Sequence, residues 1–347
     1  MIVSLIFLSS GLFLGWSLGA NNAANIFGTA VATKMIRFTT AAIICSIFVI
    51  LGAIVSGAGA SHTLGKLGSI NSLAGAFVVA LSAALTVFWM TRAGLPVSTS
   101  QPVVGAIIGW NIFSGHTTSV NTLEKIVTTW IFTPILAAIF AIIIFFVIRL
   151  ILNKSRIHLI SLDHYTRVGL IIVGAFGSYS LGANNIGNVI GVFIPVSPFR
   201  DFVSAGFSIS SLQQLFLLGG IAIAVGVLTY SKRVMLTVGK GIFRLSPITA
   251  FVAVLASSLV LFIFASQGLH DLLQSLGLPA FPLVPVSSSQ AIVGAVMGIS
   301  LAKGGRNMNF MTLGKISIGW LVTPIASSII CYILLFFMQN VFLQQVF

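Results

Sequence analysis

Long runs of apolar residues, separated by short polar loops, make up most of the chain. A run of about 20 such residues is long enough to cross the core of a bilayer as a helix. Membrane β-barrels instead alternate apolar and polar residues in strands of about ten, and no such alternation is present. The pattern therefore predicts an all-α integral membrane protein with ten hydrophobic segments, at about residues 1–20, 38–58, 74–91, 96–113, 126–148, 168–190, 212–230, 248–265, 285–300 and 315–340.

The composition agrees with this prediction. Of the 347 residues, 57% are hydrophobic and 6% are charged, whereas about 25% of the residues of a soluble domain are charged. The stretch Met1–Trp16 has no basic region before its apolar residues, so we do not expect a cleaved signal peptide. We expect a multi-pass protein of the cell membrane.

The net charge of +13 predicts an orientation in the membrane. If all ten segments cross, one set of alternate loops holds Lys34, Arg37, Arg92, Arg149, Lys154, Arg156, Arg167, Lys232, Arg233, Lys240, Arg244, Lys303, Arg306 and Lys315. The opposite set holds only Lys66, Lys125 and Arg200. Because cytoplasmic loops carry an excess of Lys and Arg, the first set should be cytoplasmic and both termini extracytoplasmic. This distribution explains the charge without a nucleic-acid partner.

Three motifs occur twice, in the same order. GANNAAN at Gly19 returns as GANNIGN at Gly182, an offset of 163 residues. PVSTSQPVVGAIIG at Pro96 returns as PVSSSQAIVGAVMG at Pro285, an offset of 189. WIFTPI at Trp130 returns as WLVTPI, an offset of 190. The chain is therefore predicted to be an internal duplication, with about 26 extra residues between the first two motifs of the second half.

The two halves are predicted to lie in the membrane in opposite orientations. Each half holds five hydrophobic segments, and an odd number reverses the direction in which the second half enters. Inverted repeats of this kind are the architecture of many secondary transporters, which bind substrate near the middle of the bilayer. We divide the chain into a first repeat at 1–150, a basic cytoplasmic linker at 151–167 and a second repeat at 168–347.

The hydrophobic segments contain no acid–base catalyst. The carboxylates Glu124, Asp163, Asp201 and Asp271 and the histidines His62, His116, His158, His164 and His270 all fall in loops or at segment edges. An intramembrane hydrolase needs a nucleophile with an acid or base partner, or a metal cluster. Cys45 and Cys331 lie within apolar segments and indicate no metal site. The sequence therefore predicts a protein that is not an enzyme and holds no cofactor.

Neutral polar residues gather instead in the repeated motifs. A single membrane asparagine usually joins helices by hydrogen bonds, but two matched clusters beside glycines that interrupt the helix favour a binding site. The PVS motifs are predicted to start helices, and two opposed helix N-termini with free N–H groups would bind an anion. The candidate residues are Asn21, Asn22, Asn25, Ser98, Thr99, Ser100, Gln101, Asn184, Asn185, Asn188, Ser287, Ser288, Ser289 and Gln290.

These motifs resemble those of the inorganic phosphate transporter (PiT) family, whose hallmark is GANDVAN in each half, followed by PVSTTH. The resemblance covers essentially the whole chain and implies a dimeric, cation-coupled symporter of an inorganic anion. It departs from the family at all four titratable positions of the signature. Asn22 and Asn185 replace the signature aspartate, and Gln101 and Gln290 replace the signature histidine. Neutral oxygen atoms near Asn22 and Asn185 could still coordinate Na⁺ as the coupling ion. H⁺ is the alternative coupling ion.

The sequence thus predicts a phosphate transporter that works by symport and alternating access. Sulfate is the alternative substrate, because a site without carboxylates does not repel an anion that has only hydrogen-bond acceptors. A passive anion channel is the second alternative. Whether the PVS segments span the membrane or re-enter it as hairpins stays open at this point.

Overall fold

The protein is almost entirely helical in a computed structural model, which describes residues 2–68, 70–92, 97–155, 158–204, 207–238, 245–305 and 310–347. These residues form thirteen α-helices, one turn of 3-10 helix and one two-stranded hairpin. The predicted all-α membrane class is confirmed. Among the residues of the sequence analysis, Pro96, Arg156, Lys240, Arg244 and Arg306 lie outside the described ranges.

The first half contains α1 (Ile2–Ala32), α2 (Phe38–Ser56), α3 (Ala58–Leu67), α4 (Leu73–Arg92), α5 (Ser100–Ser114) and α6 (Val120–Lys154). The second half contains α7 (Leu159–Ile190), η1 (Gly191–Phe193), β1 (Phe202–Ser204), β2 (Phe207–Ile209), α8 (Ser211–Thr229), α9 (Ser231–Thr237), α10 (Pro247–Ala265), α11 (Gln267–Ser275), α12 (Ser288–Ala302) and α13 (Phe310–Asn340). The predicted linker 151–167 is therefore mostly helical, because α6 and α7 extend into it.

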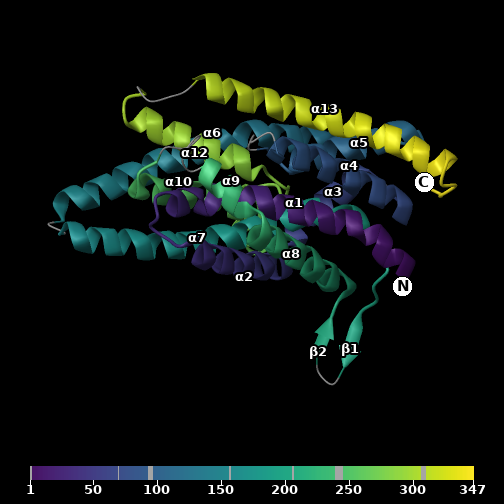
Figure 1. Cartoon of the computed structure of the whole chain (residues 1–347), viewed down its shortest axis with the longest axis horizontal. Coiled ribbons are helices and arrows are strands. Elements are labelled where there is room, and N and C mark those ends of the chain that lie inside the picture. The colour runs from purple at the N-terminus through teal and green to yellow at the C-terminus, as the bar shows by residue number, and fades with distance from the viewer. Residues whose placement is uncertain are drawn as a thin grey trace.

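Eight helices of the described chain are long and apolar enough to cross a membrane: α1, α2, α4, α6, α7, α8, α10 and α13. They run side by side along the long axis of the molecule, and the two termini lie at the same end (Figure 1). The short hairpin of β1 and β2 projects from the bundle near that end.

The two PVS segments, for which the sequence left spanning or re-entry open, form helices shorter than a membrane span. Their helices, α5 and α12, contain 15 residues each. A helix of that length measures about 22 Å, shorter than the bilayer core of about 30 Å. Both helices begin inside the protein, since Ser100 and Ser288 are buried. A helix can start there because the polar first turn finds partners on other helices, as described below.

The two halves pack against each other in matched pairs. Helix α1 packs on α8 as α7 packs on α2, and α5 packs on α13 as α12 packs on α6. Glycines make these contacts close: a Cβ at Gly105 would overlap the carbonyl oxygen of Pro324, and a Cβ at Gly294 would overlap that of Pro134. The matched contacts support the prediction of two related halves. Their opposite orientation and their boundaries stay predictions.

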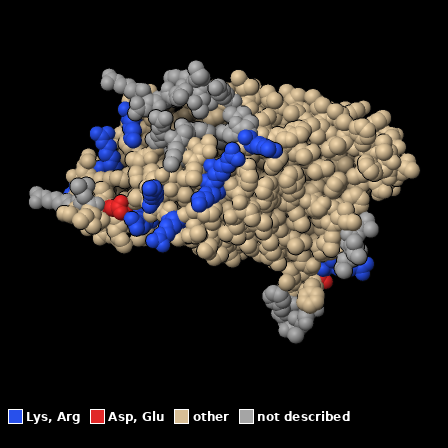
Figure 2. All heavy atoms as spheres, in the orientation of Figure 1, with Lys and Arg blue, Asp and Glu red and all other residues tan. Residues whose placement is uncertain are grey.

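Basic residues gather at the end of the bundle opposite the termini (Figure 2). Lys34, Lys154 and Lys232 lie at or near the ends of helices in the sequence. Arg200 lies away from them, beside the hairpin. This separation is the one that the positive-inside rule requires of a membrane protein with its basic end in the cytoplasm.

A membrane-impermeant thiol reagent tests this orientation. Added from outside intact cells, it should modify Arg200→Cys but neither Lys154→Cys nor Lys232→Cys, because the latter two are predicted to face the cytoplasm. The parent protein provides the control, since its own Cys45 and Cys331 are fully buried. Equal modification of Arg200→Cys and Lys154→Cys in intact cells would contradict the predicted orientation.

Candidate functional site

The asparagine clusters lie in the C-terminal halves of two continuous helices, α1 and α7. Gly19 and Gly182 do not interrupt α1 and α7, which corrects the prediction made from the sequence. Instead, these glycines let neighbouring helices approach. A Cβ at Gly19 would overlap the carbonyl oxygen of Ile223 in α8, and a Cβ at Gly182 would overlap that of Val49 in α2. The glycines therefore set the distance between helices at the level of the asparagines.

The PVS motifs start helices, as predicted, but the proline precedes the helix instead of occupying its first turn. Helix α12 begins at Ser288, three residues after Pro285. The hydroxyl of its N-cap residue Ser287 accepts a hydrogen bond of 3.1 Å from the backbone N–H of Gln290. The N-cap of α5 is Thr99, whose side chain makes no such bond. The hydroxyl of Thr99 is therefore available for partners on other helices.

All fourteen candidate residues are buried, with exposed fractions of 7% or less. One chain of hydrogen bonds joins the two halves through Thr99. The amide of Asn22 donates to the Thr99 hydroxyl at 3.4 Å, and this hydroxyl donates to Oδ1 of Asn185 at 3.2 Å. Asn188 donates to the same Oδ1 at 3.1 Å. Helix α1, the start of α5 and helix α7 therefore meet at one point.

A second chain joins the two PVS segments. Asn25 donates from Nδ2 to the hydroxyl of Ser289 at 3.4 Å. Ser289 in turn donates to the backbone carbonyl of Val97 at 2.7 Å. Ser98 and Ser100 are bonded to each other at 2.8 Å. The first turn of α12 is thus attached both to α1 and to the segment that leads into α5.

The remaining two asparagines fix the protein's own structure. Asn184 donates to the backbone carbonyl of Val286 at 2.7 Å and accepts from its N–H at 3.0 Å. Both ends of this amide are therefore bonded to the segment that leads into α12. Asn21 donates to the hydroxyl of Thr91 in α4 at 2.8 Å. These contacts make Asn184 and Asn21 positioning residues.

Several buried polar atoms of the site have no hydrogen-bond partner within the described chain. They are Oδ1 of Asn22 and of Asn188, Oε1 of Gln101 and of Gln290, and Oγ of Ser288. Leaving such a group without a partner costs about 1–3 kcal/mol. Four of the five are amide oxygens, which accept hydrogen bonds or coordinate a hard cation. The unpartnered atoms mark where a ligand with hydrogen-bond donors or positive charge would be stabilised.

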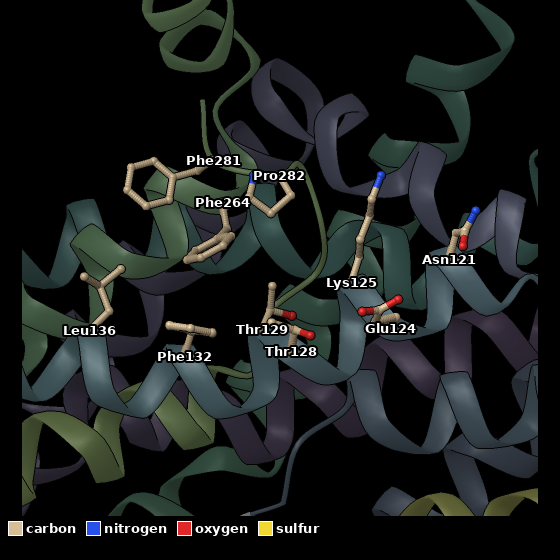
Figure 3. Close-up of a pocket in the computed structure, with 10 residues that line it drawn as sticks. All are labelled: Asn121, Glu124, Lys125, Thr128, Thr129, Phe132, Leu136, Phe264, Phe281 and Pro282. Atoms are coloured by element: carbon tan, nitrogen blue, oxygen red, sulfur yellow. The ribbon is translucent and has the colours of Figure 1, made fainter. Parts of the chain in front are cut away.

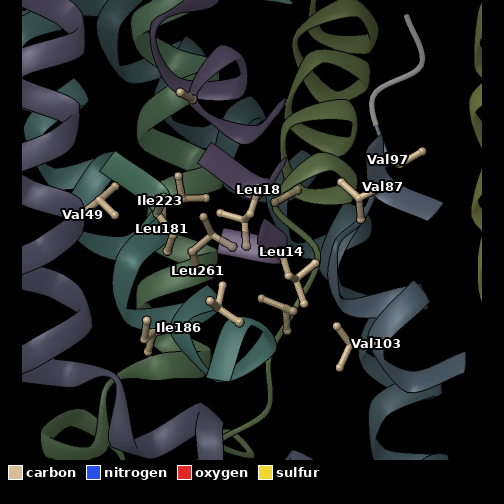
Figure 4. Close-up of a cluster of buried hydrophobic side chains, with 14 of the residues drawn as sticks. Leu14, Leu18, Val49, Val87, Val97, Val103, Leu181, Ile186, Ile223 and Leu261 are labelled. Carbon is tan, nitrogen blue, oxygen red and sulfur yellow. The ribbon is translucent and has the colours of Figure 1, made fainter. Parts of the chain in front are cut away.

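The fourteen residues themselves carry no charge. In the part of the chain that the structure describes, no group of three or more His, Cys, Asp or Glu could hold a metal ion. Positive potential comes instead from the N-termini of α5 and α12, whose first N–H groups have no partner inside the helix. Leu14, Leu18 and Leu181, which precede the asparagines by one or two turns on α1 and α7, belong to a cluster of buried apolar side chains (Figure 4). They exclude water and so strengthen each polar contact.

The sequence analysis missed three partners of the site: the hydroxyl of Thr91 and the backbones of Val97 and Val286. Thr91 falls at the end of a hydrophobic segment and belongs to no repeated motif. Backbone groups leave no signal in a sequence. Only the register of the second PVS segment against α7 puts Val286 opposite Asn184.

Comparison with known proteins identifies the family. The family described as the phosphate transporter family matches residues 18–270 and 276–346, which include every candidate site residue. The chain belongs to this family. Membership confirms the resemblance found in the motifs and shows that the protein is a transporter and not an enzyme.

Individual relatives extend the similarity over nearly the whole chain. The sulfate permease CysP of Bacillus subtilis is 30% identical, over 93% of this chain and 84% of the relative. A protein of Methanocaldococcus jannaschii named "Putative phosphate permease MJ0630" is 29% identical, over 93% of each. A solved structure titled "The sodium-dependent phosphate transporter" shares the fold with a TM-score of 0.74 at 22% identity, and the match covers 97% of this chain and 100% of that one.

Proposed function

We propose that this protein carries inorganic phosphate across the membrane, with the anion held between the asparagine clusters and the first turns of α5 and α12. One observation carries the proposal. Two helix N-termini and two neutral amide clusters, from both halves of the chain, are buried together and are joined by hydrogen bonds through Thr99 and Ser289. Free N–H groups at helix N-termini stabilise a tetrahedral oxyanion. The amides and hydroxyls add contacts without adding negative charge.

The unpartnered amide oxygens favour phosphate over sulfate. At neutral pH phosphate retains at least one O–H group, which can donate to Oδ1 of Asn22 or Asn188 or to Oε1 of Gln101 or Gln290. Sulfate has no O–H group and therefore cannot donate to these oxygens. Sulfate stays the second candidate because the site has no carboxylate to repel it and because a relative is named a sulfate permease.

Coupling to a cation is part of the proposal. The same amide oxygens could coordinate Na⁺ near Asn22 and Asn185, and the solved structure that shares this fold is titled sodium-dependent. A bound cation would offset the charge of the anion inside the bilayer. We expect transport by alternating access, in which the two halves of the chain exchange the packing contacts that each makes with the other. The predicted homodimer is part of this proposal, although no contact described here depends on it.

Uptake into proteoliposomes tests the function. Labelled phosphate and labelled sulfate are supplied separately, with an inward Na⁺ gradient, an inward H⁺ gradient or neither. We expect saturable phosphate uptake above the equilibrium level when the coupling gradient is present, and little sulfate uptake. If only sulfate is taken up, the substrate is sulfate and not phosphate. Ohmic currents without accumulation of either anion would indicate a passive channel.

Alanine at Gln101 or Gln290 should weaken phosphate affinity by about 1–3 kcal/mol, the cost of a lost buried partner. Because Oε1 of each glutamine has no partner in the described chain, thermal stability without ligand should not fall. The measurement combines the concentration dependence of uptake with melting temperature in detergent.

Asn111 provides a matched control for these two glutamines. It is a buried amide at the other end of α5, and Nδ2 donates to the carbonyl of Leu67 at 3.3 Å and to the hydroxyl of Thr118 at 2.9 Å. Asn111→Ala should therefore lower stability and leave phosphate affinity unchanged. If Gln101→Ala and Gln290→Ala behave like this control, the PVS motifs are structural and the proposed site is wrong.

A further inference from the structure

A cavity of about 620 Å³ lies outside the candidate site. It is partly open and is lined by the first half of α6, the end of α10 and the segment 276–287 that connects α11 to α12. The residues that line it are Asn121, Glu124, Lys125, Thr128, Thr129, Phe132, Leu136, Phe264, Phe281 and Pro282. None of them belongs to the repeated asparagine or PVS residues. The cavity is therefore a separate place for a ligand.

The polarity of the cavity changes along α6. Asn121, Glu124 and Lys125 lie at one end, whereas Phe132 and Leu136 lie at the other, next to Phe264 and Phe281 (Figure 3). From residue 121 to residue 136, a helix rises by about 22 Å. Half of a bilayer, from its middle through the headgroups, also measures about 20–22 Å. The cavity thus has the length and the polarity gradient of one phospholipid in a single leaflet.

Two opposite charges, on neighbouring residues of α6, lie at the polar end (Figure 3). Glu124 and Lys125 are both exposed, and the described residues make no ion pair with either of them. A carboxylate beside an ammonium group matches a headgroup that carries an ammonium beside a phosphate. A free anion would be attracted by Lys125 but repelled by Glu124, and it would gain nothing from the four apolar side chains.

We infer that this cavity binds one phospholipid with a zwitterionic headgroup that ends in a primary ammonium. The ammonium donates to the carboxylate of Glu124, and the phosphate accepts from Lys125. An acyl chain lies along Phe132 and Leu136 and contacts Phe264 on the opposite wall. A primary ammonium fits better than a trimethylated one, because only the former has N–H donors for the carboxylate.

The segment that forms one wall of the cavity leads directly to the candidate site. His270 donates to the carbonyl of Phe281 at 2.8 Å, and Thr63 donates to the carbonyl of Leu283 at 2.5 Å. Asn184 holds Val286, and Ser287 follows as the N-cap of α12. A lipid against Phe281 and Pro282 would therefore stabilise the position of Ser287.

Native mass spectrometry of the whole protein tests the inference. The protein is reconstituted with equal amounts of phosphatidylethanolamine and phosphatidylcholine, released in mild detergent and analysed for retained lipid. The parent should retain one phosphatidylethanolamine in preference to phosphatidylcholine. Glu124→Gln should reduce that preference about tenfold, which corresponds to about 1.4 kcal/mol. Phe132→Asn should reduce retention of both lipids, because it removes an apolar contact with the acyl chain.

Matched charge changes at the opposite end of the bundle serve as controls. Lys154→Gln and Asp163→Asn should leave the retained lipid unchanged, since both residues lie far along the chain from the cavity and at the basic end. Equal retention of the two lipids by the parent, or an unchanged preference in Glu124→Gln, would overturn the inference. So would a loss of phosphate uptake in Lys125→Gln that is the same with and without phosphatidylethanolamine, because the cavity would then be an entrance for the anion.

Discussion

Replacing Gly105 with alanine should destabilise the protein and abolish transport. In the middle of α5, this glycine lies against the backbone of α13, and a Cβ would lie 2.7 Å from Cα of Pro324 as well as overlapping its carbonyl oxygen. Overpacking typically costs about 1–3 kcal/mol. Here we expect the upper end of that range, because a backbone carbonyl cannot rotate away as a side chain can. Helix α5 would move, and with it Thr99 and Gln101.

The measurement is the melting temperature of the detergent-solubilised protein, together with phosphate uptake. Gly319→Ala is the matched control, since Gly319 lies in α13 and no atom of the described chain outside its own helix would come within 4 Å of the added Cβ. Gly294→Ala, at the corresponding position of α12, should be as harmful as Gly105→Ala because it meets the backbone of Pro134. Equal stability of Gly105→Ala and Gly319→Ala would show that the two helices can separate without cost.

Most of the architecture could be predicted from the sequence because lipid imposes a simple rule on it. Each spanning helix must be apolar over about 20 residues, so eight of the ten predicted segments correspond to helices of spanning length. The rule fails for α5 and α12. An apolar run shows how much chain is buried, but not that Ser100 and Ser288 begin their helices inside the bundle.

The candidate site could be predicted as a set of residues but not as a set of roles. Repetition identified Asn22 and Asn184 equally, since both stand in a GANN motif. Their contacts differ, because Asn184 is bonded at both ends to Val286, whereas Oδ1 of Asn22 has no partner in the described chain. The register of neighbouring segments decides between the two roles. That register depends on packing between distant parts of the chain, such as Gly19 against Ile223.

Restoring aspartate at position 22 should change the coupling of transport more than the folding of the protein. Asp and Asn are nearly isosteric, and Oδ1 of Asn22 already lacks a partner. The other carboxylate oxygen would face the Thr99 hydroxyl, which could donate to it only by releasing Oδ1 of Asn185. A charge at the centre of a bilayer costs about 2.5–3.5 kcal/mol on insertion scales unless a cation pairs with it. Transport by Asn22→Asp should therefore depend more strongly on Na⁺, or on a low pH at which the carboxyl group is protonated.

Aspartate at position 185, which belongs to the same series of hydrogen bonds through Thr99, should affect folding more than aspartate at position 22. Nδ2 of Asn185 donates to the backbone carbonyl of Leu181 at 3.1 Å. Asn185→Asp would replace this donor with a carboxylate oxygen, which would face the carbonyl oxygen of Leu181 without a hydrogen between them. We therefore expect a lower melting temperature for Asn185→Asp than for Asn22→Asp. Initial phosphate uptake is measured against Na⁺ concentration at two pH values for the parent, both single variants and the double variant. If correctly inserted variants all retain the Na⁺ and pH profiles of the parent, the asparagines only join helices, and the proposed role of the GANN motifs in coupling is wrong.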